Sequence, residues 1–439
     1  MTHCTPASFT VQGFGAEEQH RLLSEKEEKS RAAALEIALT ILQRSLEAEI
    51  SVELGKPHGL RRERVTAWYC RRCHTRLQCQ FRRNGHYKRC VTIREGSITV
   101  RMPLVRCHCG GYVEVPWTTL DPRARYWIDV ELDGIRRYLA GTSYRLTADA
   151  IGTEAQTNVS HVQPWRTMQG VGEHIVDTLQ QPDAASGLKT HLGPCPRTVI
   201  LDEVYVSVAG VNLVFLVAVA DDARVLAVWG PTTRTLDSWQ ELLEWLTDHG
   251  ISPQSGLIGV TADGDGAIRE AVALVWPNVV QQQCVWHILE RVADDVIAEY
   301  GREAPEVEAI VTQATSVLLH NSQQVGAMGR AMDRLQEFLI DHQGTAWGET
   351  VHRAFWEGTQ YLRTSGLHPT NGAAERLIKQ LRRRTKTMDG FKSEEGARNF
   401  AATWRLWQNM RHELAVEQKQ RSRRRKRNLK VRQPNPKLP

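Results

Sequence analysis

The segments VILDEVYVSV (residues 199–208) and LIGVTADGDG (residues 257–266) decide the fold of this chain. Each is short and rich in Val, Ile and Leu, and each carries a carboxylate, Asp202 in the first and Asp263 in the second. Such runs are typical of buried strands in a mixed sheet rather than of helices. We therefore expect the two carboxylates to converge at one edge of a sheet.

The flanking sequence predicts the rest of an α/β domain. Ala209 and Gly210 indicate a tight turn between the first strand and the next. Strands that precede helices, followed by a β-α-β passage, predict a mixed sheet covered by helices. By apolar spacing, further strands are expected at residues 211–220, 224–230 and 279–283, and helices at residues 235–249, 267–275 and within 289–363.

A third carboxylate comes from TNGAAERLIKQLRRRTK, residues 370–386. The helix is expected to begin near Pro369, with Thr370 or Asn371 as its N-cap. Two Mg²⁺ ions held by carboxylates roughly 3.5–4 Å apart can activate a hydroxyl and stabilise the leaving oxygen of a phosphodiester. A carboxylate on a basic helix face suits such a site beside DNA. Helical spacing gives Glu375 one face with Lys379, Arg382, Arg383 and Lys386.

Cys284 and His287 follow the expected fifth strand, one helical turn apart. They have the spacing of half a zinc site, but no second pair follows at metal-ligand spacing. A buried structural pair, or one that shapes the active site and holds a DNA strand, is the favoured interpretation.

These motifs, in this order, resemble the Mutator-like DDE transposases of bacterial insertion sequences. The likeness rests on Asp202, the Asp263-Gly264 pair, the Cys-x-x-His motif, and TNGAAER followed by a basic helix and MDGFKS (residues 388–393). It spans roughly the second half of the chain. The resemblance implies a ribonuclease-H-like mixed sheet with a helical insertion at about residues 289–365.

The resemblance also implies an activity. Asp202, Asp263 and Glu375 would be the catalytic acids and would bind Mg²⁺ or Mn²⁺, with Cys284 and His287 near the active site. The enzyme would nick DNA at terminal inverted repeats and transfer the 3′-hydroxyl into target DNA. A synaptic complex holds two DNA ends, so a homodimer or a larger assembly is expected.

Two of the three expected catalytic acids have a neighbouring carboxylate that could bind the metal ions instead. Glu203 follows Asp202, and adjacent strand residues point to opposite faces, so only one of the pair can face the metals. The resemblance favours Asp202. Asp263 is favoured over Asp265 because it lies at a strand end, whereas Asp265 lies in a glycine-flanked loop. Without the resemblance, Glu375 would be an ordinary surface carboxylate.

A second cluster lies nearer the N-terminus, where six of the nine cysteines fall between residues 70 and 109. Two knuckles joined by a predicted β-hairpin can close a structural, tetrahedral Zn²⁺ site. The spacing in the second knuckle is shorter than usual, and free core cysteines are the alternative to zinc. The expected ligands are Cys70, Cys73, Cys107 and Cys109, with His74, Cys79, Cys90 or His108 as possible replacements for one of them.

Basic residues gather in two stretches. Residues 56–106 contain fourteen Lys or Arg and two Glu, and residues 418–439 contain ten Lys or Arg and no acid. The whole chain has a net charge of only +6, so the remainder is acidic. Basic flanks around an acidic centre are typical of phosphate-binding parts that surround a metal site, so DNA is the expected partner.

The N-terminal half is expected to be modular. Residues 17–50 predict a helix that packs on its own domain, with a dimerising helix as the alternative. Ser160 or His161 can begin the recognition helix of a helix-turn-helix, although a plain helical linker fits equally well. The expected divisions are a helical segment (1–55), a zinc-ribbon-like module (56–120), a helical DNA-binding region (121–180), the catalytic domain (195–415) and a basic tail (416–439) whose charge predicts disorder in isolation.

Composition also excludes some classes. The longest apolar run, residues 211–220, is too short to span a bilayer, and the first residues lack the pattern of a signal peptide. We expect a cytoplasmic, nucleoid-associated protein. A DNA-binding regulator without catalytic activity is the alternative function, but its phosphate-binding surface would gain nothing from three carboxylates that repel phosphates. A nuclease that cuts without joining is a third.

Overall fold

The computed structural model describes two compact units, one of Met1–Tyr138 with Thr142–Thr167 and one of Leu139–Gly141 with Met168–Pro439. The main division falls between Thr167 and Met168, which are neighbours in one helix. Cys79 and most of the expected boundary at 180–196 lie outside the described residues. The described ranges are 16–54, 68–76, 80–120, 125–180, 192–321, 324–388 and 390–431.

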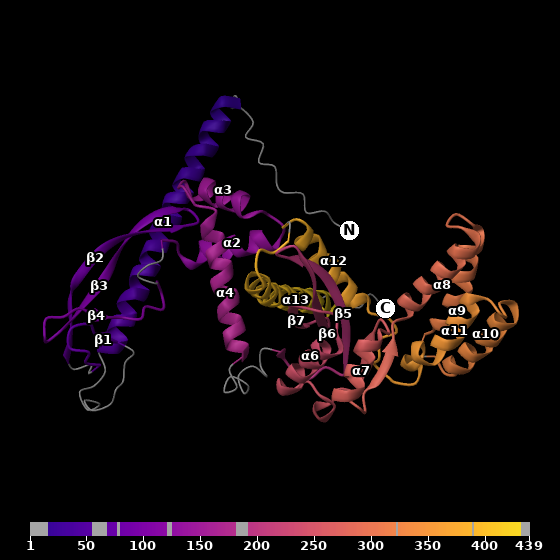
Figure 1. Ribbon diagram of the computed structural model, residues 1–439. Helices are drawn as coiled ribbons and strands as arrows, with labels where there is room; N and C mark the ends of the chain where they lie inside the picture. The colour runs from indigo at the N-terminus through magenta and orange to yellow at the C-terminus, as the bar shows by residue number, and fades with distance from the viewer. Residues whose placement is uncertain are drawn as a thin grey trace, which may run out of the picture. The chain divides into compact units, whose positions relative to one another are not determined.

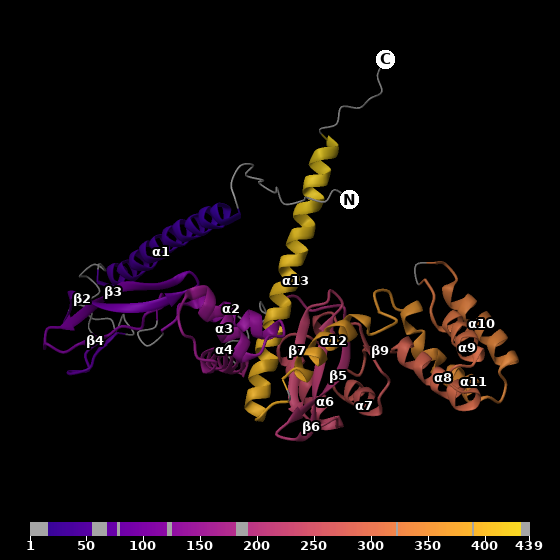
Figure 2. The ribbon, with the colours of Figure 1, turned by 90° about the horizontal axis from the view of Figure 1, so that it is seen from above.

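The first unit is built on a long helix and a β-hairpin. Helix α1 (Ala16–Leu54) lies along the hairpin of β2 (Phe81–Ile93) and β3 (Gly96–Cys107), as Figures 1 and 2 both show. Leu42 and Leu46 are fully buried against the apolar residues of the hairpin. The prediction that this helix packs on its own unit is therefore confirmed.

Two short strands and three helices complete the first half of the chain. Strand β1 (Tyr69–Cys70) pairs antiparallel with β4 (Val113–Glu114). Helices α2 (Ile128–Leu139), α3 (Tyr144–Ala155) and α4 (Val162–Gln180) follow. Helix α4 begins next to His161, where a recognition helix was expected, so the helical prediction is confirmed and a groove contact stays a prediction.

The second unit contains a five-stranded mixed sheet in the order β7-β6-β5-β8-β9. In this sheet β6 pairs antiparallel with both β5 and β7, whereas β8 pairs parallel with β5, and β9 pairs parallel with β8. All five lie within two residues of their predicted positions. Their bounds are β5 (Thr198–Val208), β6 (Val211–Ala220), β7 (Val225–Thr232), β8 (Gly259–Ala262) and β9 (Val280–Gln283).

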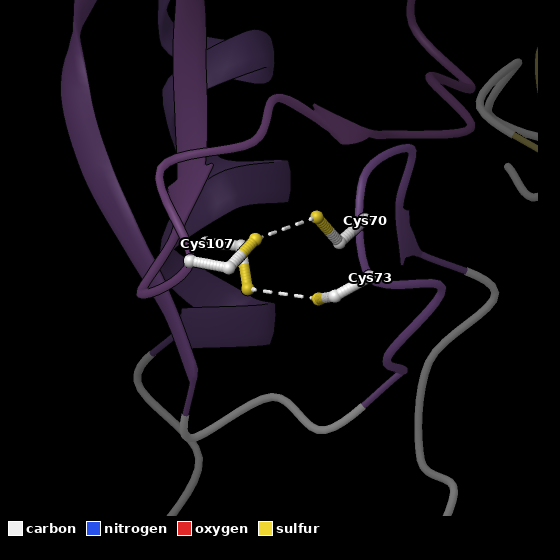
Figure 3. A group of neighbouring side chains, drawn as sticks. Cys70, Cys73 and Cys107 are labelled. Carbon is white, nitrogen blue, oxygen red and sulfur yellow. Dashed lines mark hydrogen bonds between the residues drawn. The ribbon is translucent and has the colours of Figure 1, made fainter.

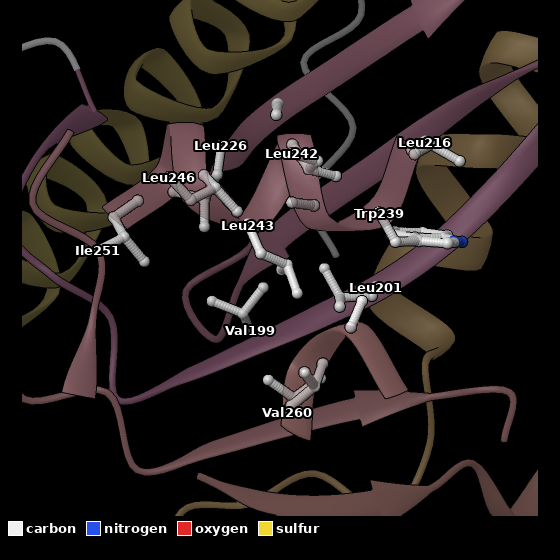
Figure 4. Packing of buried hydrophobic residues seen from close by; sticks show 14 of the residues in the cluster. Val199, Leu201, Leu216, Leu226, Trp239, Leu242, Leu243, Leu246, Ile251 and Val260 are labelled. Carbon is white, nitrogen blue, oxygen red and sulfur yellow. The ribbon is translucent and has the colours of Figure 1, made fainter. Parts of the chain in front are cut away.

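One face of this sheet packs on helices α6 (Leu236–Asp248) and α7 (Gly266–Val275). Val199 and Leu201 of β5 belong to this core, which Figure 4 shows together with Trp239 of α6. Because side chains alternate along a strand, Glu203 continues the same face as Leu201, and Asp202 takes the opposite one.

Four helices follow β9 and form a core of their own. They lie in the segment where almost no strand signal was found, and their apolar faces pack on one another. They are α8 (Val285–Tyr300), α9 (Pro305–Leu318), α10 (Ala327–Asp341) and α11 (Ala346–Gly358).

The last two helices flank the sheet. Helix α12 (Gly372–Lys386) packs on β5, and α13 (Glu394–Val431) packs on β7. Between them Phe391 pairs with the end of β5, where its backbone exchanges hydrogen bonds with Ser207 and Ala209. Gly390 has a φ of +80°, and a Cβ there would lie 2.9 Å from the Ser207 carbonyl oxygen, which explains the glycine of MDGFKS.

Helix α13 runs without a break through residue 416, where the basic tail was expected to begin. The described part of the tail is therefore helical as a continuation of α13, and its disorder in isolation stays a prediction. Phe400 and Trp404 anchor the start of the helix in the core, and Lys and Arg are good helix formers. Among the described helices, none is both long and apolar enough to cross a membrane.

Candidate active site and metal centre

Asp202 lies in the middle of β5, on the face of the sheet opposite α6. Its Oδ1 accepts a hydrogen bond from the backbone N–H of Glu203 at 2.8 Å, and its Oδ2 accepts one from Nδ2 of Asn371 at 2.7 Å. Burial raises the pKa of Asp202 to about 6, and the carboxylates of Asp263 and Glu375 act in the same direction. The structure thus brings Asp263 and Glu375 close enough to Asp202 to influence its carboxyl electrostatically.

Glu203 is more buried than a surface carboxylate, with only 9% of its side chain exposed. Its Oε1 forms an ion pair of 2.9 Å with Nε of Arg234, and its Oε2 is buried without a hydrogen-bond partner among the described residues. Burial raises the pKa of Glu203 to about 7. Glu203 is therefore a buried, paired carboxylate and not a surface one.

Arg234, in the loop between β7 and α6, gathers three carboxylates. In addition to Glu203, its Nη2 lies 3.1 Å from Oδ2 of Asp263 and 3.1 Å from Oδ2 of Asp265. One guanidinium carries a single positive charge, so the cluster keeps an excess of negative charge. A divalent cation would compensate that excess.

Asp263 and Asp265 differ in what else they do. Asp263 directly follows β8, and its Oδ1 accepts a hydrogen bond from the backbone N–H of Asp265 at 2.8 Å. Asp265 is the N-cap of α7, where its Oδ1 accepts from the N–H of Ala267 at 2.9 Å. One oxygen of the Asp265 carboxylate therefore caps the N-terminus of α7.

Glu375 lies in the first turn of α12 and is exposed. Within the described residues its carboxylate makes no ion pair with Lys379, which was the ordinary explanation for this residue. Ala374, Ile378 and Leu381 form the buried face of the helix. The predicted DNA-binding residues are all exposed on α12: Lys379, Arg382, Arg383 and Lys386.

Cys284 and His287 belong to the same site. Cys284 is fully buried at the N-terminus of α8, and its thiol donates to Oδ1 of Asn371 at 3.2 Å. The Cys284 side chain is the largest influence that raises the pKa of His287, to about 9, and the Asp202 carboxylate acts in the same direction. The pKa of His287 is therefore well above its ordinary value, and its Nδ1 is buried without a hydrogen-bond partner among the described residues.

Asn371 connects these groups, and its role was missed. The sequence suggested it as an N-cap, but its side chain caps nothing. Its amide instead bridges Cys284 and Asp202, which lie 87 and 169 residues away in the chain. Asn371 is fully buried, as such a bridge requires. The one sequence signal for this role is that Asn371 lies four residues before Glu375. The sequence contains no comparable signal for Arg234.

The cysteine cluster of the first unit forms as predicted. The Sγ atoms of Cys70, Cys73, Cys107 and Cys109 all lie within 4.8 Å of one another. Two sulfur pairs are closer, Cys70 with Cys109 at 3.4 Å and Cys73 with Cys107 at 3.7 Å (Figure 3). Tetrahedral Zn²⁺ with bonds of about 2.3 Å separates its sulfur ligands by about 3.8 Å. The donor set and spacing therefore fit zinc.

Turn geometry and electrostatics agree with a zinc site. Gly110 donates its N–H to the Cys107 carbonyl at 2.8 Å, which closes the second knuckle despite its short spacing. A Cβ at Gly111 would lie 2.7 Å from Sγ of Cys70, so only glycine fits there. Burial raises the pKa of Cys107 to about 12, whereas at Cys70 hydrogen bonds from the backbone outweigh burial and lower the pKa to about 6.

The alternative ligands do not join this group. Cys90 is exposed on β2, outside the cluster, and Cys79 lies outside the described residues. Among the described residues, neither His74 nor His108 is part of the group. The one-residue spacing between Cys107 and Cys109 is therefore compatible with a four-cysteine site.

The fold and site define a class: a mixed α/β protein with an acid cluster at its strand ends and a separate four-cysteine group. Comparison with family models identifies the class further, because residues 60–404 match the model of the Mutator family of transposases. The chain belongs to that family, whose members are DNA-processing enzymes. A search among curated proteins finds no match.

Proposed function

We propose that the chain is a DDE transposase that nicks DNA at terminal inverted repeats and joins the freed 3′-hydroxyl to target DNA. Asp202, Asp263 and Glu375 would be the catalytic acids on a ribonuclease-H-like sheet within residues 195–415. The observation that carries the proposal is their convergence: the strand-end carboxylate of Asp263 and the helix carboxylate of Glu375 both act on the mid-strand carboxyl of Asp202, although the three are far apart in the chain.

The three acids would hold two Mg²⁺ or Mn²⁺ ions, which supply Lewis-acid activation of the attacking hydroxyl and of the leaving oxygen. The residues present fit such ions, because carboxylate oxygens are the donors that hard cations prefer and Arg234 balances only part of the negative charge of the carboxylates it contacts. Asn371 would fix the orientation of the Asp202 carboxylate. His287, whose raised pKa favours its charged form, would offset part of the charge of the acids and attract a phosphate.

Other parts of the chain would hold the DNA. The exposed cations of α12, which include Lys379 and Arg382, share a helix with Glu375, so phosphates bound there would lie beside the acids. The four-cysteine group would be a structural zinc site that shapes a DNA-contacting module at residues 56–120. The helical region 121–180 and the basic tail would add further contacts, and a dimer or larger assembly would bring two ends together.

Strand transfer in vitro tests the proposal. The assay uses purified chain, Mg²⁺ or Mn²⁺, labelled DNA that ends in the repeats flanking its own gene, and a supercoiled target. We expect joined product from the unaltered chain and none from Glu375→Gln, because the amide keeps the size of the side chain but is a poor ligand for a hard cation. Glu395→Gln, in the exposed first turn of α13, is the matched control and should join normally.

The same assay separates the alternatives. DNA binding without cleavage in either metal would favour the regulator derived from a transposase. Cleavage without joining would identify a nuclease. Normal joining by Glu375→Gln would remove Glu375 from the site while leaving the transposase assignment intact.

Loss of the Asn371 bridge should weaken catalysis without abolishing it. Asn371→Ala removes the hydrogen bond to Asp202 and leaves the acids in place, so we expect activity to fall by about 10- to 100-fold, the usual effect of removing a partner that orients a metal ligand. The Mg²⁺ concentration for half-maximal activity should rise as well. Thr370→Ala, one residue away, should change neither quantity. An unchanged Mg²⁺ dependence in Asn371→Ala would contradict the orienting role.

A further inference from the structure

Arg234 is held between acids that differ in how exposed they are. Its Nε lies 2.9 Å from Oε1 of Glu203, whose side chain is only 9% exposed. Its Nη2 lies 3.1 Å from Oδ2 of Asp263 and 3.1 Å from Oδ2 of Asp265, whose side chains are 18% and 26% exposed. The guanidinium therefore has one side anchored on a buried glutamate and another side turned to two more accessible aspartates.

Both carboxylate oxygens of Asp263 already have a partner in this structure. Oδ1 accepts a hydrogen bond from the backbone N–H of Asp265 at 2.8 Å, and Oδ2 faces Arg234. The backbone contact fixes the direction of the side chain, and the guanidinium supplies the opposite charge. Among the described residues, no other Arg or Lys forms an ion pair with Asp263, Asp265 or Glu203. The charge compensation of the proposed second acid therefore depends on Arg234.

The ion pair between Glu203 and Arg234 is poorly explained as a stabilising contact. Burying two charges costs free energy, which their attraction offsets only when the remaining polar atoms are hydrogen-bonded as well. Oε2 of Glu203 is buried without such a partner among the described residues. Replacing a buried ion pair by apolar residues is often neutral or stabilising. The more direct consequence of this pair is that it keeps Arg234 in place beside the aspartates.

We propose that Arg234 is a positioning residue that acts as a tethered counter-ion for Asp263. It neutralises and orients this carboxylate before a divalent ion binds, and it gives up Oδ2 when the ion binds, while Glu203 retains its Nε. The inference rests on the proposed function, which supplies the divalent ion. Without Arg234 the clustered carboxylates would repel one another, and with it an arriving cation must displace a positive charge. Arg234 therefore holds the site in its folded arrangement and at the same time weakens metal binding.

The test measures Mn²⁺ binding by the full chain without DNA, so its readout does not depend on activity. The melting temperature is recorded without added divalent ions and across a Mn²⁺ titration, because a ligand that binds only the folded protein raises it according to the ratio of concentration to Kd. We expect Arg234→Gln to melt at a lower temperature without Mn²⁺. It should bind Mn²⁺ about 10-fold more tightly, the order of effect expected when one positive charge is removed a few ångströms from a divalent ion near the surface.

Three further variants show whether the effect is specific. Arg234→Lys keeps the positive charge and should bind Mn²⁺ nearly as the unaltered chain does. Arg224→Gln is the matched control, because it breaks an ion pair of 2.6 Å with Asp222 in the turn between β6 and β7. It should lower the melting temperature without changing the Mn²⁺ affinity. Asp202→Asn should remove the shift that Mn²⁺ causes, which shows that the acids hold the measured ion.

The sign of the change in Mn²⁺ affinity decides the inference. Equal or weaker Mn²⁺ binding by Arg234→Gln would overturn the counter-ion role and leave the proposed metal site standing. If this variant is unfolded without divalent ions, Mn²⁺ should restore a cooperative melting transition, because the ion replaces the missing charge, and failure to do so would overturn the role as well. Absence of Mn²⁺ binding by the unaltered chain would instead overturn the metal site of the proposed function, and this inference with it.

Discussion

Asp263→Asn should abolish strand transfer, with a loss on the order of 10³-fold or more, as is typical when one member of a catalytic unit is removed. Asp263 directly follows β8, beside the cation Arg234 and within electrostatic reach of Asp202. Its replacement by an amide removes a metal ligand but keeps the shape of the strand end. The measurement is joined product per enzyme in Mg²⁺, with DNA binding and melting temperature recorded for the same preparation.

Asp265 provides the matched control for that experiment. Asp265→Ser removes a carboxylate from Arg234 but keeps a good N-cap for α7, so the fold should be retained. We expect strand transfer within a few-fold of the unaltered chain, because the proposed second acid is still present. If Asp265→Ser is inactive and Asp263→Asn is active, the second catalytic acid is Asp265 and not Asp263.

The strands of the sheet were predictable because each is a short apolar run with a clear interruption. Ala209 and Gly210 both have positive φ, 50° and 84°, which is the conformation of a tight hairpin turn. Their sequence signal is local, and so is the signal for a strand that ends before Asp263. Boundaries within two residues follow from such local rules.

The connections within the site depend on contacts that no local pattern carries. The spacing predicts Asn371 as the N-cap of a helix. Its amide instead forms hydrogen bonds with Asp202 and Cys284, because the fold buries all three side chains together. Arg234 occupies an unremarkable loop and becomes important only because β8 and β5 bring their acids to it. The helical conformation of the described tail likewise depends on the rest of the chain, because a helix already anchored by Trp404 extends into it.

Loss of one zinc ligand should have the largest effect on stability. Four cysteine sulfur atoms within 4.8 Å of one another match the donor set and the spacing of a tetrahedral structural Zn²⁺ site. Structural Zn²⁺ contributes about 10–16 kcal/mol in zinc-finger peptides, which is as large as the whole stability of an ordinary domain, about 5–15 kcal/mol. We therefore expect Cys107→Ser to lose bound zinc and to unfold the knuckles formed around β1 and β4.

Metal analysis and hydrogen exchange measure this prediction. The unaltered chain should contain one zinc ion per chain, and Cys107→Ser or a strong chelator should remove it. Backbone protection should then be lost at residues 68–76 and 107–114 but retained in the five-stranded sheet, which belongs to the other unit. Cys90→Ser is the control, since Cys90 is an exposed cysteine of the same hairpin outside the cluster. Equal zinc content and equal protection in the two variants would mean that the four cysteines hold no metal, and that the first unit is stabilised by the packing of α1 on the hairpin instead.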